Sequence, residues 1–169
     1  GLRPGDVLLL TKPIGTGTLF AAQARAASVP GFRGRWIDAA LDSMVSSNRA
    51  GAQLLLQHGA TACTDLTGFG LLGHLVEMTR PSAVDAEIDL SALPVLAGAE
   101  ACVAAGIASS LAPANVRLRR ALRNQADFVD HPRYALLFDP QTAGGLLAGI
   151  PAARAPACVD ALRAAGYPQ

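Results

Sequence analysis

The sequence predicts an α/β (α+β) protein in which helices pack on a mixed β-sheet as a layered sandwich. Short continuous apolar runs, typical of buried strands, alternate along the chain with longer segments whose apolar residues recur at helical spacing. Turns containing glycine or proline separate these segments. The chain has 169 residues, of which 51% are hydrophobic and 16% are charged, so we expect one domain with a buried core.

Five segments are predicted as strands. The run from 7 to 11 is apolar almost throughout, which is typical of a buried strand. Between 83 and 90, apolar and acidic residues alternate, which predicts a strand with one face in water. The predicted strands are 7–11, 61–64, 83–90, 134–138 and 146–150.

Helical spacing predicts the other elements, and 107–130 is expected to be mostly loop. Between 37 and 57, Ser46–Asn48 is expected to separate two helices, and Gly59 to end the second in a left-handed conformation. The predicted helices lie at 19–27, 37–57 (as two helices), 71–79, 94–105 and 152–165.

Composition and charge exclude several function classes. The formal net charge of +1 gives no argument for a nucleic-acid or membrane-surface partner, and no apolar run approaches the length of a membrane span. The three cysteines are far apart and form no C-x-x-C pair, which argues against a zinc site or a disulfide framework and fits a reducing cytoplasm. Both ends of the sequence indicate a piece of a longer chain.

The segment TDLTGFGLLGH, from Thr64 to His74, carries the clearest chemical pattern. It places the carboxylate of Asp65 and the hydroxyl of Thr67 at a predicted strand-to-helix junction, where Gly68 lets the backbone approach a ligand. Asp65 is therefore a candidate Mg²⁺ ligand, because Mg²⁺ prefers hard oxygen ligands and usually bridges to phosphate. The alternative is that Asp65 only caps the helix. His74 is interpreted as a structural histidine.

Lys12 is the only lysine in the chain. It follows a predicted buried strand and precedes a glycine turn, a position where α/β folds place ligand-binding groups. Its compact positive charge suits phosphate. A solvated surface lysine is the alternative interpretation.

The segment DPQTAGG at 139–145 joins two predicted strands and has the residues of a turn. The sequence contains no Ser-His-Asp or Cys-His pattern, so the residues themselves indicate neither a nucleophile nor a general base.

Three segments together resemble selenophosphate synthetases, and they cover the chain in the same order and spacing. The middle one is the specific motif, because more distant relatives such as aminoimidazole ribonucleotide synthetase share the fold but carry other residues there. The segments are LTKPIGTG at 10–17, CTDLTGFGLLGH at 63–74 and FDPQTAGGLL at 138–147.

The resemblance implies that residues 1–169 are the single C-terminal domain of an enzyme that converts ATP, selenide and water to selenophosphate, AMP and phosphate. Asp65 would be a Mg²⁺ ligand at the ATP phosphates, and Lys12, Thr67 and Gly68 would bind ATP. The reactive Cys or selenocysteine, its Lys partner and other Mg²⁺ carboxylates would lie in an N-terminal domain outside this chain. No catalytic residue is therefore assigned here, and we expect the chain alone to be inactive. The family also implies a cytoplasmic homodimer.

The sequence departs from the family pattern at Ala143, where the family usually has Ser, and the family's chain continues into a final strand after 169. Two other functions stay open. The chain could be a non-catalytic nucleotide-binding or packing module. It could also belong to another ATP-using protein of the same superfamily that acts on a purine or thiamine precursor, although the motif at 65–70 argues against this.

Overall fold

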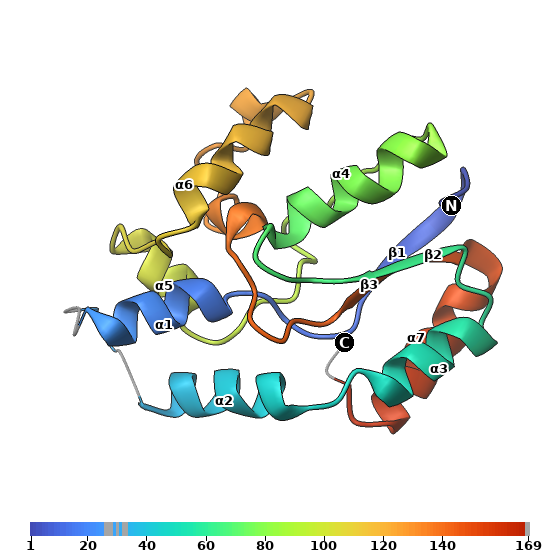
Figure 1. Cartoon of the computed structure of the whole chain (residues 1–169), viewed down its shortest axis with the longest axis horizontal. Helices are drawn as coiled ribbons and strands as arrows, with labels where there is room; N and C mark the ends of the chain where they lie inside the picture. The colour runs from blue at the N-terminus through green and yellow to red at the C-terminus, as the bar shows by residue number, and fades with distance from the viewer. Residues whose placement is uncertain (26–28, 30, 32–33, 168–169) are drawn as a thin grey trace.

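A three-stranded sheet forms the centre of the fold. The computed structural model describes residues 1–25, 29, 31 and 34–167. Strands β1 (Asp6–Leu10), β2 (Ala62–Asp65) and β3 (Leu146–Pro151) pair antiparallel in the order β1-β3-β2 (Figure 1). Among the described residues, parallel pairing occurs as an isolated bridge between Ile14 and Val95.

One face of the sheet is covered by two helices, α3 (Arg49–Gln57) and α7 (Ala155–Ala164). Successive side chains on a strand point to opposite faces, so Leu9 and Leu146 share a core with these helices. The segment after α7 is tied to α3, because the hydroxyl of Tyr167 accepts a 2.7 Å hydrogen bond from the amide of Gly51.

The other face is covered mainly by α4 (Gly70–Ser82), which packs on β2. Leu10 and Leu147, which are next in sequence to Leu9 and Leu146, point to this second face. They belong to a hydrophobic core that is larger than the one under α3 and α7. The remaining elements are α1 (Thr16–Ala24), α2 (Gly34–Val45), α5 (Ala99–Ala104), α6 (Ala112–Asn115) and 3-10 turns at Val116–Ala121, Gln125–Asp127, Ala135–Phe138 and Ala152–Arg154.

The α/β fold class is confirmed, and most predicted elements match. The strands predicted at 7–11, 61–64 and 146–150 are β1, β2 and β3, and the stretch 37–57 is two helices. Gly59 has the expected positive φ, 79°. The helix predicted at 19–27 corresponds to α1, but residues 26–27 lie outside the described part of the chain.

The strand predicted at 83–90 is wrong. Ala83 ends α4 in the left-handed region at φ 52°, and the segment 84–89 then runs without a ladder partner. Alternation of apolar and acidic residues is satisfied by any extended segment with one face in water, so the pattern did not require a sheet.

The strand predicted at 134–138 is also wrong, because Ala135–Phe138 is a 3-10 turn. Leu136, Leu137 and Phe138 are all buried, and a short apolar run buried on every side has no period that separates strand from helix. The helix predicted at 94–105 begins only at Ala99. The backbone before it is tied instead to Ile14, which exchanges hydrogen bonds with Pro94 and Leu96.

No helix within the described residues is long and apolar enough to cross a membrane.

Candidate functional site

Three loops meet at one edge of the sheet, which we call the loop edge. Because β1 and β2 both run antiparallel to β3, their C-terminal ends lie beside the N-terminal end of β3. The loop edge therefore gathers residues 11–15, 66–69 and 139–145, which carry the three motifs of the sequence.

The buried side chain of Gln141 joins these loops. Its Oε1 accepts hydrogen bonds from the amides of Gly15 (3.0 Å) and Thr16 (3.3 Å) and from the Thr16 hydroxyl (3.1 Å). Its Nε2 donates to the carbonyl oxygen of Asp139 at 2.8 Å. The backbone amide of Gln141 donates to the carbonyl of Thr67 at 2.9 Å. One residue thus fixes the loop after β1 and the loop after β2.

Asp139 is a buried carboxylate, only 1% exposed. Its Oδ1 accepts a 2.7 Å hydrogen bond from the hydroxyl of Thr18, and its Oδ2 accepts a 3.1 Å bond from Gln141 Nε2. Burial raises the pKa of Asp139, and the hydrogen bonds from Thr18, Gln141 and the backbone of Gly17 offset part of that rise.

Lys12 lies inside the loop edge, with 3% of the residue exposed. Its ammonium donates to the backbone carbonyls of Ser46 (2.6 Å) and Ala143 (3.2 Å). Burial lowers the pKa of this group. The surface-lysine alternative is therefore wrong, while the predicted contact with phosphate stays a prediction.

Asp65 is the last residue of β2, opposite Leu146, and its side chain is exposed at the loop edge. The described residues contain no cluster of three or more His, Cys, Asp or Glu side chains that could hold a metal ion. Asp65 could therefore supply one oxygen ligand, and a complete site would need others. Partial burial and the nearby Asp65 carboxylate raise the pKa of the Cys63 thiol, which disfavours a reactive thiolate.

The loop after Asp65 is held in place by main-chain contacts. The Thr67 carbonyl accepts a hydrogen bond from the Gly70 amide, and the Gly68 carbonyl accepts one from Asn115 Nδ2 at 2.8 Å. The N-cap of α4 is Phe69, which makes no side-chain cap bond, so the alternative that Asp65 caps this helix is wrong.

A hollow of about 590 Å³ borders the loop edge, and its lining includes Thr16, Gly17, Gly68 and Thr142. A Cβ placed on Gly68 would meet no atom within 4 Å, so the backbone is open to a ligand there. In contrast, a Cβ on Gly17 would lie 2.5 Å from the carbonyl oxygen of Pro140. Of the predicted ATP-binding residues, Gly68 therefore borders the hollow, Thr67 is its half-buried neighbour, and Lys12 is buried and does not line the hollow.

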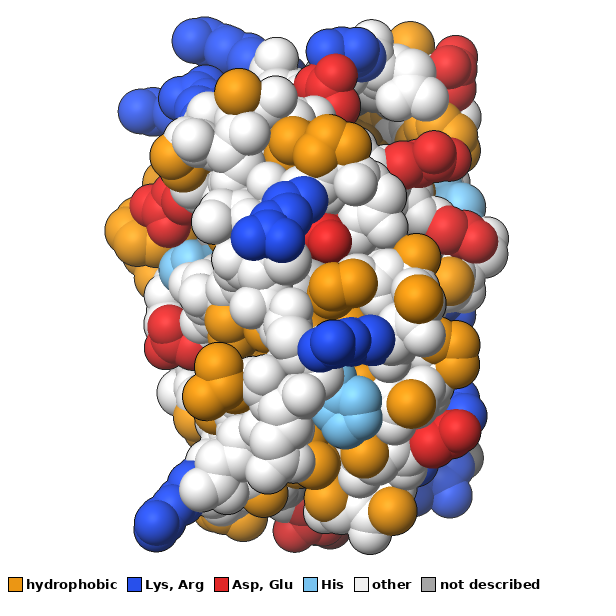
Figure 2. Space-filling view, turned by 90° about the vertical axis from the view of Figure 1, so that its right-hand side faces the viewer, with side chains coloured by type: hydrophobic (Ala, Val, Ile, Leu, Met, Phe, Trp, Pro, Cys, Tyr) orange, Lys and Arg blue, Asp and Glu red, His pale blue; other side chains and the backbone are white. Residues whose placement is uncertain are grey.

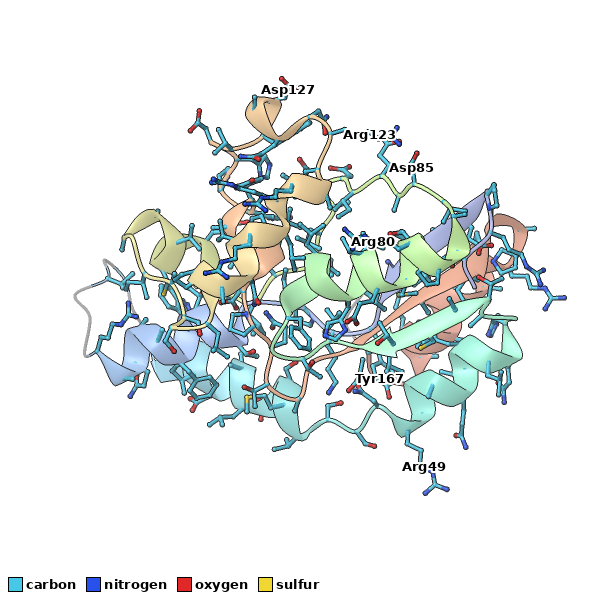
Figure 3. The ribbon with its side chains drawn as sticks, turned by 45° about the horizontal axis from the view of Figure 1, so that its top comes forward. Arg49, Arg80, Asp85, Arg123, Asp127 and Tyr167 are labelled. Atoms are coloured by element: carbon cyan, nitrogen blue, oxygen red, sulfur yellow. The ribbon has the colours of Figure 1, made fainter. Side chains whose placement is uncertain are left out.

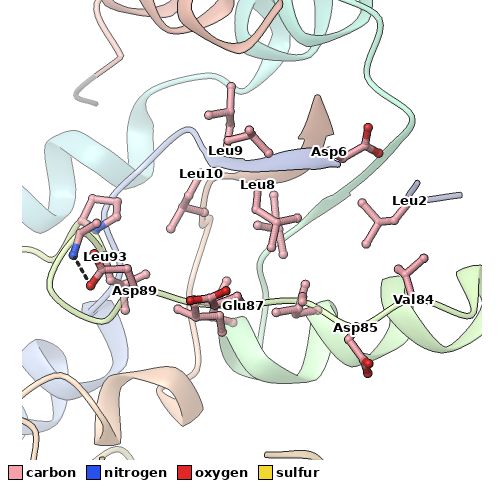
Figure 4. Close-up of a pocket in the computed structure, with 18 of the residues that line it drawn as sticks. Leu2, Asp6, Leu8, Leu9, Leu10, Val84, Asp85, Glu87, Asp89 and Leu93 are labelled. Atoms are coloured by element: carbon pink, nitrogen blue, oxygen red, sulfur yellow. Dashed lines mark hydrogen bonds between the residues drawn. The ribbon is translucent and has the colours of Figure 1, made fainter. Parts of the chain in front are cut away.

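A second cavity, of about 520 Å³, lies between β1 and the segment 84–89 (Figure 4). Apolar side chains such as Leu8, Leu10 and Val84 line it, with Asp85 and Glu87 around them. None of its lining residues belongs to the candidate site residues at the loop edge.

The face in Figure 2 carries both basic and acidic side chains, with hydrophobic ones between them. Arg123 Nη2 and Asp85 Oδ2 form an exposed ion pair at 2.6 Å (Figure 3).

The polar network of Asp139 and Gln141 was missed from the sequence, where 139–145 was interpreted as a turn. No local signal marks it, because a polar stretch between two apolar segments is equally typical of an exposed turn. The partners of Asp139 and Gln141 that bury this stretch lie more than 120 residues earlier in the chain.

Residues 3–169 match the protein family described as AIR synthase related protein, C-terminal domain. The chain belongs to this family. The match agrees with the layered α/β fold and extends over the loop edge with all three of its motifs.

Relatives of this chain are named selenide, water dikinase, which confirms the resemblance to selenophosphate synthetases. The one from Geobacter metallireducens is 44% identical over 148 residues, covering 86% of this chain and 41% of the relative. The one from Nitratidesulfovibrio vulgaris is 40% identical over 157 residues, covering 89% and 42%. The one from Rhizobium meliloti is 38% identical over 168 residues, covering 99% and 47%. The chain spans less than half the length of these relatives.

Solved structures of the hydrogenase maturation protein HypE share the fold. One has a TM-score of 0.64 at 22% identity, and the matched region covers 96% of this chain and 41% of the HypE chain. Another, in complex with ATP, has a TM-score of 0.62 at 22% identity, and the matched region covers 96% of this chain and 39% of the HypE chain.

Proposed function

We propose that this chain is the C-terminal domain of a selenophosphate synthetase, which converts ATP, selenide and water to selenophosphate, AMP and phosphate. The names of the relatives support the reaction class, and the ATP complex of HypE supports nucleotide binding by this fold. The domain would contribute one ligand to a Mg²⁺–ATP site and close the active site against an N-terminal domain.

The observation that carries this proposal is the exposed carboxylate of Asp65 at the loop edge, beside a loop whose backbone is open at Gly68. A single carboxylate fits the way proteins commonly hold Mg²⁺, through one or two carboxylates, substrate phosphates and water. When bound, the metal would neutralise phosphate charge and orient the transfer. Thr67 and Gly68 would line the phosphate end of the nucleotide.

The proposal for Lys12 takes a different form from that for Thr67 and Gly68. The ammonium is buried and already donates to two carbonyls, so its contribution to ATP binding would include holding the Ala143 carbonyl and its loop in place. The proposed enzyme would work in the cytoplasm as a homodimer, with the reactive Cys or selenocysteine in its N-terminal domain.

The test is selenide-dependent formation of AMP from ATP by protein made from the full reading frame. Asp65→Asn is expected to lower the turnover about 100-fold or more, the several kcal/mol that a catalytic metal contributes. Asp127→Asn is the matched control, because Asp127 is also an exposed aspartate but lies on a 3-10 turn at the outer end of the 116–127 segment (Figure 3). It should leave turnover unchanged.

Full turnover of Asp65→Asn would overturn the assigned role of Asp65. Absence of selenide-dependent AMP formation in the wild-type protein would favour the non-catalytic module instead. The 169-residue chain, assayed beside the full protein, is expected to be inactive.

A further inference from the structure

His74 is buried within α4 yet reaches back to the loop that follows Asp65. Only 6% of the residue is exposed. Its Nε2 lies 3.1 Å from the amide nitrogen of Thr67 and 3.0 Å from the Thr67 hydroxyl oxygen. The Phe69 ring and the imidazole pack in a T-shaped arrangement, with ring centroids 5.8 Å apart and ring planes at 67°.

The contact with the amide fixes the protonation of the ring. A backbone N–H can only donate, so Nε2 must carry a lone pair, and the proton of the neutral ring is then on Nδ1. Nδ1 is buried and has no hydrogen-bond partner among the described residues. The nearest carboxylate is Glu77, whose Oε2 lies 3.5 Å away on a side chain that is 67% exposed.

The residue that His74 holds is a junction of the loop edge. The Thr67 amide binds His74, and the Thr67 carbonyl accepts from both Gly70 and Gln141. Thr67 also stands between Asp65 and Gly68 in the chain. The position of the loop that presents these two residues therefore depends on the acceptor that His74 offers.

A histidine that only filled the core would not need this arrangement. A buried Nδ1 without a hydrogen-bond partner destabilises the folded chain, and an apolar side chain of similar size would avoid this. The cost is offset where the ring acts as an acceptor for an amide that is otherwise without a backbone partner in the described structure.

We propose that His74 is a positioning residue for the Asp65 site, acting as a neutral imidazole that accepts the Thr67 amide at Nε2. The expected effect of His74 on turnover rests on the proposed function. The hydrogen bond from the Thr67 amide to His74 does not depend on that function. His74 itself touches neither the metal nor the nucleotide in this account.

Two substitutions separate positioning from core filling, both made in the full-length protein. His74→Gln keeps an oxygen acceptor with a reach close to that of Nε2, whereas His74→Leu keeps a similar volume without an acceptor. We expect His74→Leu to lower kcat/KM for ATP about 10- to 100-fold, the usual effect of removing an outer partner of a metal site. His74→Gln should recover most of that loss. Equal loss in both variants, or full activity of His74→Leu, would overturn the positioning role.

The second measurement reads the tautomer directly. In full-length protein labelled with [¹⁵N]histidine, the His74 signals are assigned by their disappearance in His74→Gln. We expect a neutral ring protonated on Nδ1 at pH 7.5, and a ring protonated on Nε2 would overturn the inference. Because this signal needs no turnover, failure of the proposed function, seen as a fully active Asp65→Asn enzyme, is distinguishable from failure of this inference.

Discussion

The hydroxyl of Thr18 donates a 2.7 Å hydrogen bond to Oδ1 of Asp139, which lies 121 residues further along the chain. The bond ties α1 to the loop that enters β3, and both partners are at most 2% exposed. A hydrogen bond to a buried charged acceptor contributes more than one between neutral groups.

Thr18→Val is therefore expected to destabilise the protein by about 1.5–3 kcal/mol at pH 7, because it removes a donor from a buried carboxylate at nearly constant volume. Urea unfolding of the wild-type and variant chains measures the difference. Thr79→Val is a suitable control, since the Thr79 hydroxyl donates only a long, 3.4 Å bond to Val76 within its own helix. A Thr18→Val chain as stable as this control would contradict the account.

The effect of Thr18→Val should depend on pH. The folded-state pKa of Asp139 is raised above its ordinary value of 3.8, so the folded chain holds this proton more tightly than the unfolded chain. The tighter binding of this proton stabilises the folded chain. The stabilisation is fully present below pH 3.8 and is lost as the pH rises through the folded-state pKa of Asp139. Removing Thr18 raises the folded pKa further, since its hydrogen bond lowers it.

The stability gap between wild type and Thr18→Val should consequently widen from pH 4 towards pH 7. Unfolding free energies measured across that range test this expectation. If the difference in unfolding free energy stayed constant, Asp139 would not change its charge between pH 4 and pH 7.

Ala143 occupies the left-handed region at φ 48°, although it is not a glycine. Ala143→Gly should stabilise the chain by about 0.5–1 kcal/mol, because the relief of backbone strain exceeds the added flexibility of the unfolded chain. Ala52→Gly, at an exposed position inside α3, should instead destabilise by about 1 kcal/mol. Thermal unfolding of both variants gives the comparison, and a loss of stability in Ala143→Gly would refute the strain argument.

Gly68, in the loop after β2, and Gly70, the first residue of α4, form a matched pair. Gly70 has φ 71°, and a Cβ there would lie 2.9 Å from the backbone carbon of Phe138, so Gly70→Ala should cost about 2 kcal/mol or more of stability. Gly68→Ala should leave stability within about 0.5 kcal/mol because the space around Gly68 is open.

If the nucleotide approaches Gly68, the stable Gly68→Ala variant should still raise the KM for ATP in the full-length enzyme. Calorimetry and steady-state kinetics on the same preparations separate the two effects. Unchanged KM together with unchanged stability would remove Gly68 from the binding site.

The parts of this protein that sequence reasoning could predict are those that depend on near neighbours in the chain. The apolar run of β1 and the glycine-rich turn after Asp65 are local patterns, and both were predicted correctly. Burial of Lys12 was not predicted, because its carbonyl partners, Ser46 and Ala143, lie 34 and 131 residues away. Only the folded sheet brings such groups together.

The same limit explains the two wrong strands. An extended segment such as 84–89 and a buried turn such as Ala135–Phe138 have the residue pattern of a strand, and only the presence or absence of a ladder partner decides between the structures. Asp139 was likewise interpreted as a turn residue because its donor, Thr18, is distant in sequence.

The most direct measurement of the central claim is the affinity of the full-length protein for Mn²⁺ in the presence of ATP, with Mn²⁺ as the paramagnetic substitute for Mg²⁺. Asp65→Asn should bind the metal about tenfold more weakly or worse, while Asp127→Asn should bind it as tightly as wild type. Equal affinity in wild type and Asp65→Asn would contradict the claim that this domain supplies a ligand to the metal–nucleotide site.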